Sequence, residues 1–336
     1  MVVNNTSHVK LSNVELVRTA LLEHADTRIG FSGRTGLSLA TCATILNEMV
    51  ATGEAILADE LTTSGGRPAQ VYRYNPHFAH IASVFVTNEA GLNRVVCATS
   101  TGTGETLFPR TTLPSAIEYE TVESTIAELL DQDPLIKAVG IGVPGVVHRG
   151  VIGQGDIPSL RGVPLADRIQ CRFGVTVIVE NDMNATAYGY YHAHSRELDS
   201  LAVVILPKGN GPGTGIIVDG KILRGHSGFA GEVHYLPENY NPLFQATGDQ
   251  ATFLGALAKM VATVVALVNP QRILLTGELV KAGMIEPLTR ALQGIIPPEH
   301  CPELVFQENC SEEYLEGLRL KAHESLRYQY RLTTQE

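Results

Sequence analysis

Apolar residues near the start of the chain recur at helical spacing and predict three successive helices. A capping box of Ser12 and Glu15 opens a first helix that ends near residue 24, and a short helical segment follows around Phe31. Ser38 comes directly after a glycine-containing turn and is expected to cap the third helix, which Gly53 ends. The apolar side chains of this helix fall on one face, namely Cys42, Ile45, Leu46, Met49 and Val50. This layout is typical of a helix-turn-helix unit.

The other face of the third helix is small or polar near its N-terminus, as in a helix that enters the major groove of DNA. We expect Ala40, Thr41 and Thr44 to face DNA, with Ser38 and Arg34 beside them. Two short strands follow at residues 55–58 and 69–74. The sequence between them, TTSGGRP at 62–68, carries Arg67 at the tip of a hairpin, as in the wing of a winged helix-turn-helix. A three-helix module that serves only packing shares the helix spacing, so this alternative stays open.

The charge of this segment predicts weak phosphate contacts. The expected recognition helix, residues 39–52, contains no Lys or Arg, and acidic residues slightly outnumber basic ones between residues 1 and 75. Phosphate contacts would rest largely on Arg28, Arg34 and Arg67, so affinity should depend only weakly on salt. We therefore expect DNA binding to need a dimer, which doubles these contacts.

Residues 79–336 alternate strand-like and helix-like segments, which indicates an α/β body. Two strands meet around a turn at 88–91, a helix follows near 121–130, and the strand 138–143 runs into Pro144-Gly145. A second half opens with the apolar strand 201–206 and a hairpin at Asp219-Gly220. It continues with a helix that Asp249 caps and that runs to Val268, apolar nearly all round and so expected to be buried. A strand at 272–276 and a terminal helix that begins at Ser311 follow. No low-complexity linker separates the halves, so we expect them to share a crevice.

The sequence VIVENDMNATA, residues 177–187, marks the place where a buried strand opens into this crevice. A β-favouring run ends at Glu180, Asn181 and Asp182, and a helix of small residues follows. Ligands of open α/β sheets bind at the carboxyl ends of strands. Asp182 is therefore a candidate general base, or an acceptor for the hydroxyl group of a polyol. The alternative, that Asp182 or Asn184 only caps the helix, fits the spacing equally well.

Composition excludes several classes of protein. With 44% apolar and 18% charged residues over 336 positions, the chain is an ordinary globular protein of two or three domains. The net charge of -10 argues against non-specific polyanion binding by the whole molecule, and leaves open a single module that binds nucleic acid. The five cysteines share no CxxC spacing, so neither a zinc ribbon nor a disulfide framework is indicated. No leader pattern opens the chain and no apolar run reaches the length of a membrane span, so we expect a cytoplasmic protein with no membrane partner.

These motifs resemble those of the ROK family of repressors, uncharacterised reading frames and kinases. The match runs, in the family's order, through TGLS (35–38), GGRP (65–68), GIGVPG (140–145), VENDMNATA (179–187) and DGKILRGHSGFAGE (219–232). The resemblance implies a winged helix followed by a two-lobed, actin-like (ribonuclease-H-like) ATPase-fold body. It also implies that Asp182 stands at the position of the kinase base, and that Asp182, Asn181 and Glu232 contact a sugar.

Several nucleotide-binding motifs of the family are altered in this sequence. Family kinases open the body with an Asp-x-Gly-x-Thr turn, yet no Asp occurs between residues 80 and 104. The second phosphate loop reads GNGPGTG at 209–215, where Asn210 replaces a hydroxyl residue and Pro212 has no N–H to donate. Glu278 stands in place of a glycine in the last loop and would repel a phosphate group. Because phosphoryl transfer depends on positioning and charge stabilisation, we expect no kinase activity and regard Asp182 as a vestige of the catalytic base.

The zinc site of the family is also missing. The family reads GExGH followed by a CxCGxxGC cluster, whereas His234 comes one position early after Glu232 and the next cysteine is Cys301. We therefore predict no metal and no cofactor. Asn181, Asp182, Glu232 and His234 remain as candidate ligands of a small molecule.

Together these features favour a DNA-binding transcriptional regulator, such as a repressor, whose body senses a sugar or sugar derivative. The expected parts are a winged helix-turn-helix domain (1–78), a first lobe (79–185) completed by a C-terminal helix (311–330), and a second lobe (186–310). Effector binding would change the angle between the lobes, and so the spacing of the winged helices of a homodimer or tetramer on a double-stranded operator. Two alternatives stay open: an ATP-dependent sugar kinase with an appended DNA-binding domain, and a ligand-free dimerisation scaffold.

Overall fold

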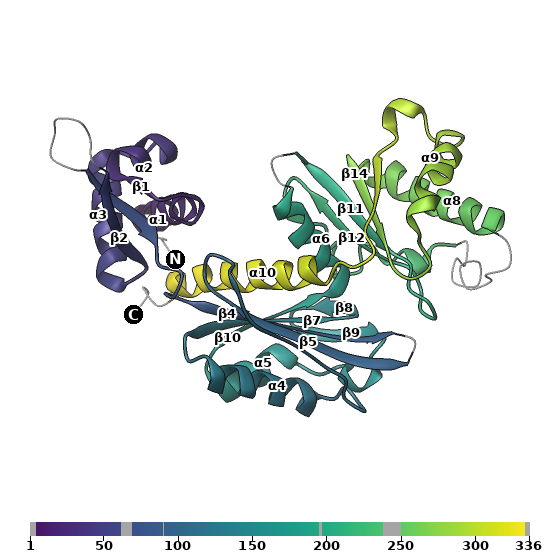
Figure 1. Ribbon diagram of the computed structural model, residues 1–336, viewed down its shortest axis with the longest axis horizontal. Coiled ribbons are helices and arrows are strands. Elements are labelled where there is room, and N and C mark those ends of the chain that lie inside the picture. The colour runs from purple at the N-terminus through teal and green to yellow at the C-terminus, as the bar shows by residue number, and fades with distance from the viewer. Residues whose placement is uncertain (1–4, 62–68, 90, 195–196, 238–249, 333–336) are drawn as a thin grey trace.

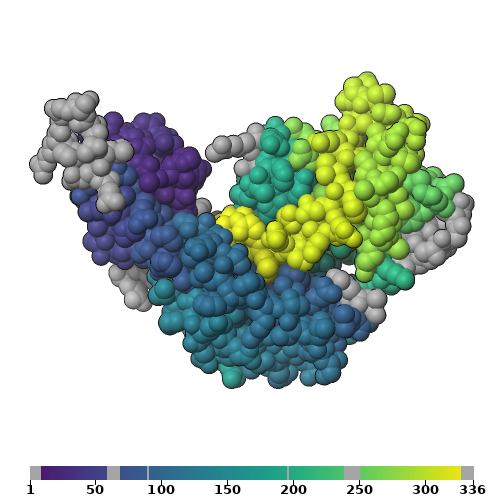
Figure 2. All heavy atoms as spheres, in the orientation of Figure 1, coloured from purple at the N-terminus to yellow at the C-terminus, as the bar shows by residue number. Residues whose placement is uncertain are grey.

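The computed structural model describes residues 5–332 except 62–68, 90, 195–196 and 238–249. The chain forms an N-terminal domain and two lobes, each built on its own β-sheet (Figure 1). This arrangement confirms the α/β class expected from the sequence. Helix α10 (Ser311–Leu332), drawn in yellow, lies between the two lobes in the space-filling view (Figure 2).

The N-terminal domain combines three helices with a three-stranded antiparallel sheet, in the arrangement of a winged helix. Its helices are α1 (Asn5–Glu23), α2 (Arg28–Thr35) and α3 (Leu39–Thr52), and its strands lie in the order β1 (Asp26–Thr27), β3 (Ala69–Tyr74) and β2 (Ala55–Leu61). Both predicted caps of α3 are confirmed, since Ser38 accepts the Thr41 N–H and Gly53 has the left-handed conformation at φ 81°. The predicted wing tip with Arg67 lies outside the described residues.

The first helix differs from the prediction. It begins at Asn5, so Ser12 lies inside it and not at its N-cap. Glu15, expected to close the capping box, forms an ion pair with Arg18, which also pairs with the buried carboxylate of Glu54. Once a helix exists, each further residue adds a backbone hydrogen bond, so the residues before Ser12 join it.

The first lobe is a five-stranded sheet in the order β10-β7-β4-β5-β6. Its strands are β4 (His80–Glu89), β5 (Leu92–Ser100), β6 (Thr106–Thr112), β7 (Ile136–Val143) and β10 (Thr176–Asn181). β4, β7 and β10 run parallel, so their carboxyl ends meet at one edge, while β5 and β6 are antiparallel to their neighbours. The hairpin β8 (Gly145–His148) and β9 (Val151–Gly155) follows β7 at this edge.

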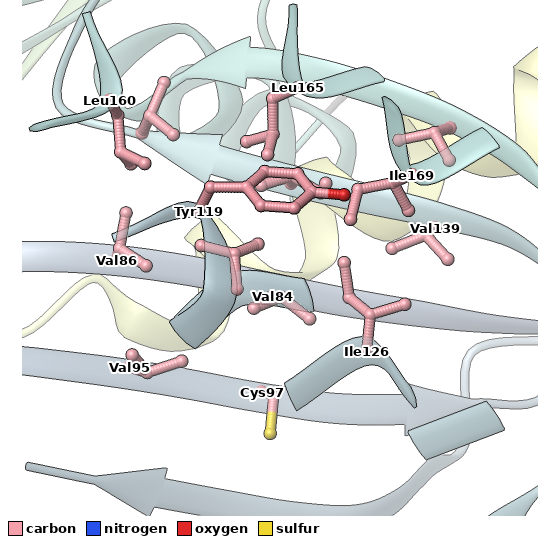
Figure 3. Close-up of a cluster of buried hydrophobic side chains, with 14 of the residues drawn as sticks. Val84, Val86, Val95, Cys97, Tyr119, Ile126, Val139, Leu160, Leu165 and Ile169 are labelled. Carbon is pink, nitrogen blue, oxygen red and sulfur yellow. The ribbon is translucent and has the colours of Figure 1, made fainter. Parts of the chain in front are cut away.

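Helices cover both faces of the first sheet (Figure 1). On one face lie α4 (Tyr119–Gln132) and α5 (Leu165–Phe173), whose buried side chains pack onto those of β4, β5 and β7 (Figure 3). On the other face α10 places Leu318 against Phe85, and Ala322 against Ile81 and Ala138. The terminal helix predicted from the sequence therefore supplies part of the core of this lobe.

The second lobe carries a sheet in the order β13-β12-β11-β14-β15. Its strands are β11 (Ser200–Ile205), β12 (Gly213–Val218), β13 (Lys221–Ile222), β14 (Arg272–Thr276) and β15 (Glu303–Phe306). Helices α8 (Gln250–Val268) and α9 (Ile285–Gln293) pack into one core and α6 (Asp182–Ala193) into another.

Helix α8 is long and apolar enough to cross a membrane, but half of its apolar stretch is buried inside this lobe. The helix was expected to be buried and is so only in part, because Leu267 is 79% exposed. A helix that covers one face of a sheet leaves its far side open to solvent. The predicted cap, Asp249, lies outside the described residues.

Helices α6 and α10 cross in close contact and join the two lobes. Two glycines permit this approach. A Cβ atom on Gly189 would lie 1.9 Å from the carbonyl oxygen of Glu313, and one on Gly317 would lie 1.9 Å from that of Ala185. The contact holds the start of α6, and with it Asp182, against the helix that spans the first lobe.

Candidate functional site

The junction of β10 and α6 places Asn181 and Asp182 at the carboxyl edge of the first sheet, where Asn181 pairs with Val143 of β7. Asn181 caps α6: its Oδ1 accepts the Asn184 N–H at 3.0 Å, and its Nδ2 donates to the Gly145 carbonyl oxygen at 2.9 Å. The alternative in which Asp182 or Asn184 is the cap is wrong, because Asn181 has the extended backbone that a cap requires (φ −64°, ψ 144°). Asp182 is the first helical residue, so its carboxylate does not serve as the cap.

A cleft of about 690 Å³ opens between the lobes beside this junction. Its walls include the β8–β9 hairpin, the loop that follows β11, residues 232–235 and the first turn of α10. All four residues predicted to bind a small molecule line it, namely Asn181, Asp182, Glu232 and His234. The fold thus gathers these side chains around one space.

Three carboxylates line the cleft, those of Asp156, Asp182 and Glu232, and we call them the acidic triad. Burial, together with the charges of the other two, raises the pKa of Asp182 to about 7. Burial also raises the pKa of Asp156 and of Glu232, and the charge of Asp156 adds to the shift at Glu232. Among the residues that the structure describes, no Lys or Arg forms an ion pair with the triad. A positively charged group placed here would offset the repulsion between these carboxylates.

Asp156 was not identified from the sequence. It directly follows β9, and a carboxylate at the end of a strand near the crevice is the signal that could have revealed it. Nδ2 of Asn210 donates a hydrogen bond of 2.9 Å to Oδ2 of Asp156. Because Asn210 belongs to the loop after β11, this bond reaches across the cleft from one lobe to the other.

His234 lies beside the triad, with its Nδ1 3.4 Å from Oε2 of Glu232. Burial lowers the pKa of His234, while a hydrogen bond to the Pro212 backbone and the charge of Asp156 act in the opposite sense. The imidazole is therefore neutral near pH 7 and does not compensate the charge of the triad.

Glu180, one residue before Asn181, differs from the triad because it has a cationic partner. Its Oε2 forms an ion pair with Arg224 from the segment that follows β13. Its Oε1 accepts a hydrogen bond of 3.2 Å from Nδ2 of Asn184. This buried carboxylate is thus compensated within the fold and holds the two lobes together.

The cleft wall also contains a further carboxylate, Glu278, and two stacked aromatic rings. Oε2 of Glu278 accepts a hydrogen bond of 2.7 Å from the backbone N–H of Lys208. The rings of Phe85 and Tyr314 stack with their centroids 4.2 Å apart. A Cβ atom on Gly142 would lie 2.3 Å from the Tyr314 hydroxyl oxygen, so this ring fills the space beside β7.

The candidate DNA-contacting face lies on α3, in the domain farthest from the second lobe (Figure 1). Ala40 and Thr44 are exposed, and Thr41 is partly exposed. Ser38 is exposed too, but its hydroxyl group is engaged with the Thr41 N–H as the cap of α3. The first turns of α3 therefore present small side chains with methyl and hydroxyl groups.

The arginines near this face are bonded within the domain. Nε of Arg34 donates to Asp26 at 3.0 Å. Arg28 donates to the Tyr72 hydroxyl oxygen at 2.7 Å and to Oδ1 of Asn47 at 2.9 Å. Each guanidinium group would have to give up one of these hydrogen bonds to contact a phosphate group.

Residues 86–247 match the ROK family. A xylose repressor from Caldicellulosiruptor bescii is 24% identical over 250 residues, which are 70% of this chain, and the chain spans 61% of the length of that repressor. A glucokinase from Streptomyces coelicolor is 38% identical over 103 residues, 30% of this chain and 32% of the glucokinase. Among solved structures, a ROK family transcriptional regulator described as a homolog of the E. coli MLC protein aligns with a TM-score of 0.76 over 96% of this chain and 98% of its own, at 18% identity. This likeness shows the fold expected from the sequence.

Proposed function

Because residues 86–247 are a ROK family domain, we propose that the chain is a sequence-specific DNA-binding transcriptional regulator whose cleft senses a sugar or a sugar derivative. The observation that carries the proposal is an exposed helix-turn-helix face in the same chain as a cleft lined by hydrogen-bonding groups. The MLC-like regulator supports it, since its fold is similar over nearly the whole chain. The regulator acts in the cytoplasm as a homodimer or tetramer.

Helix α3 enters the major groove in this proposal. Ala40, Thr41 and Thr44 offer methyl and hydroxyl groups, which suit the edges of bases. Because Arg28 and Arg34 are bonded within the domain, few cations remain for phosphate groups. Binding then depends on two copies that occupy a two-fold symmetric operator, and affinity falls only gently with salt.

Helix α10 offers a route from the cleft to the N-terminal domain. Ser311 and Tyr314, near its start, line the cleft. His323, roughly 14 Å farther along the helix axis, lies against Tyr74 at the end of β3. A ligand that changes the angle between the lobes would shift this helix and so reorient the winged helix.

Kinase activity is absent in this proposal. A nucleotide phosphate would meet Glu278 at the Lys208 N–H, and Asn210 is bonded to Asp156. The relatives nevertheless include a glucokinase, so a sugar kinase with an appended DNA-binding domain is the first alternative. A scaffold that has lost all ligands and serves dimerisation is the second.

Selection of bound fragments from a random DNA pool tests the regulator, at about 50 mM salt, where phosphate contacts are strong. We expect the wild-type protein to enrich a two-fold symmetric site, and Ala40→Glu and Arg67→Ala to weaken this enrichment. Ala266→Glu adds the same charge at an exposed helical position of the second lobe and should bind like the wild type. No enrichment by the wild-type protein would contradict the proposal.

Two assays with a panel of sugars separate the alternatives: thermal unfolding with and without MgATP, and measurement of the ADP released from MgATP. Stabilisation by a sugar alone favours the sensor. ADP release that depends on the sugar and is lost in Asp182→Asn favours the kinase. A flat response to every sugar favours the scaffold.

A further inference from the structure

The charges of the cleft indicate which kind of sugar it takes, an inference that rests on the sensing part of the proposed function. Of the described residues that line the cleft, five are acidic: Asp156, Asp182, Glu232, Glu278 and Glu308. The basic ones on the same wall are Arg94 and Lys281, and His234 is neutral. Negative charge is thus in excess, and it is concentrated in the acidic triad.

Two buried hydroxyl groups point independently to a ligand in this cleft. Tyr314 is 6% exposed and lines the cleft, and its hydroxyl group has no hydrogen-bond partner among the described residues. Burial raises the pKa of this tyrosine, and the charges of Asp182 and Glu180 add to the shift. Oγ1 of Thr214, also on the cleft wall, is likewise unpaired within the described part of the chain. Because a buried hydroxyl group without a partner costs free energy, both atoms mark places for polar groups of a ligand.

We propose that the cleft binds a polyhydroxylated ligand with a protonated amine, such as an amino sugar with a free amino group, through Asp156, Asp182 and Glu232. An ammonium group donates charge-assisted hydrogen bonds and cancels the repulsion within the triad, whereas a neutral hydroxyl group leaves that repulsion in place. The hydroxyl groups of the ligand meet Tyr314 and Thr214. A phosphorylated or acidic sugar is rejected, because it adds negative charge where negative charge is already in excess.

Asp156 is the residue that sets this charge preference. Asp182 and Glu232 by themselves could accept hydrogen bonds from a neutral sugar, as the family resemblance implies. Asp156 adds a third carboxylate, which Asn210 orients by its 2.9 Å hydrogen bond. Its replacement by asparagine keeps the size of the side chain and removes the charge.

Isothermal titration calorimetry of the full chain near neutral pH tests the proposal. The probes are D-glucosamine, D-galactosamine and D-mannosamine, their neutral parents D-glucose, D-galactose and D-mannose, and glucose 6-phosphate. We expect at least one amine to bind about tenfold or more tightly than its parent, and glucose 6-phosphate to bind more weakly than glucose. Because Asp182 is partly protonated near neutral pH, the amine should also expel a proton, which titrations in buffers of different ionisation enthalpy detect.

Variants of the acidic triad test which carboxylate causes the tighter binding of the amine. Asp156→Asn should remove most of the advantage of the amine over its parent, and Glu232→Gln provides a second variant should the first fold poorly. Glu308→Gln removes an equal charge elsewhere on the cleft wall and should leave the advantage unchanged. A neutral sugar that binds as tightly as its amine, an advantage that survives both triad variants, or no binding by any probe would overturn the proposal. The selection of bound DNA fragments tests separately whether the protein is a DNA-binding regulator.

Discussion

The hydroxyl group of Tyr74 lies 3.5 Å from Nε2 of His323, and this contact joins the last strand of the winged helix to α10. The two rings meet edge to face with their centroids 6.3 Å apart, and both side chains are buried. The residues are 249 positions apart in the chain. The orientation of the candidate DNA-binding domain therefore depends on a helix whose other end lines the cleft.

His323→Ala should loosen the N-terminal domain from the body. Loss of this buried ring removes its contacts with Tyr74, at about 2 kcal/mol of unfolding free energy. Hydrogen exchange should quicken in β3 and α1 and remain slow in β7 and β10. His192→Ala, at an exposed position of α6, is the matched control. Unchanged exchange in β3 would mean that α10 does not hold the domain.

The stability of the protein should fall as pH rises through the titration of Asp182. The pKa of this group is about 7 in the folded protein against an ordinary value of 3.8, so the folded state binds more protons between these values. The stabilising contribution is complete below pH 3.8 and is lost as pH rises to about 7, at about 1.4 kcal/mol per pH unit.

Asp182→Asn should reduce this pH dependence to the part that the raised pKa of Asp156 and of Glu232 contributes. The amide stays neutral, so the variant gains stability relative to the wild type as pH rises from about 5 to about 8. Urea denaturation at several pH values measures the effect. Asp219→Asn, in the exposed turn between β12 and β13, should keep the slope of the wild type. A slope in Asp182→Asn as steep as that of the wild type would contradict the assignment to Asp182.

Gly317→Ala should destabilise the protein by about 3 kcal/mol or more. The new methyl group would overlap the carbonyl oxygen of Ala185, so α6 and α10 would have to separate. Gly255→Ala is the control, because this exposed glycine of α8 has nothing within 4 Å of the added atom. That substitution should stabilise by about 0.5 to 1 kcal/mol through helix propensity. Chemical denaturation compares the unfolding free energies of the two variants. Equal changes in the two would contradict the close crossing of α6 and α10.

Two substitutions of Ser38 separate its role as a cap from its place on the DNA face. Ser38→Ala loses the bond to the Thr41 N–H and should cost about 1 kcal/mol of stability. Ser38→Asp keeps a capping oxygen but adds negative charge beside the expected phosphate groups. It should retain stability and lose most of its affinity for the selected operator, as measured by fluorescence anisotropy. Tight binding by Ser38→Asp would place the start of α3 away from DNA.

Glu54→Ala should unfold the N-terminal domain at a lower denaturant concentration. It leaves the buried guanidinium group of Arg18 without one carboxylate, a loss of about 3 to 5 kcal/mol for buried pairs. The double variant Arg18→Met with Glu54→Leu removes both charges and should recover most of the stability. If the double variant is no more stable than Glu54→Ala, the two side chains stabilise the domain through their shape and not through their charge.

Local signals in the sequence predicted much of the fold. Ser38 and Gly53 bound α3 as expected, and β14 spans the predicted residues 272–276. The helix start predicted from the capping box at Ser12 was wrong, because a cap motif inside a longer helix has the same sequence as one at its start. Caps and periodicity depend on neighbours a few positions away, and these are visible in the sequence.

The site was predicted only in part. The motif around Asn181 and Asp182 marked the end of β10, and both residues line the cleft with Glu232 and His234. Asp156 was missed because its surroundings form only when Asn210 approaches it across the cleft. The hydrogen bond from Asn181 to the Gly145 carbonyl oxygen was hidden in the same way, whereas its role as the cap of α6 is local and was assigned to the wrong residues.

The α/β class, the helix-turn-helix spacing and the strand end at which polar groups gather were visible in the sequence, because these features follow from short-range periodicity and turn chemistry. The partners of each carboxylate were not visible there, because they come from distant parts of the chain. Glu180 meets Arg224, whereas Asp182 meets the like charges of Asp156 and Glu232. The physical reason is that charge and burial depend on distance in space, and these segments come together only when the two lobes fold and pack.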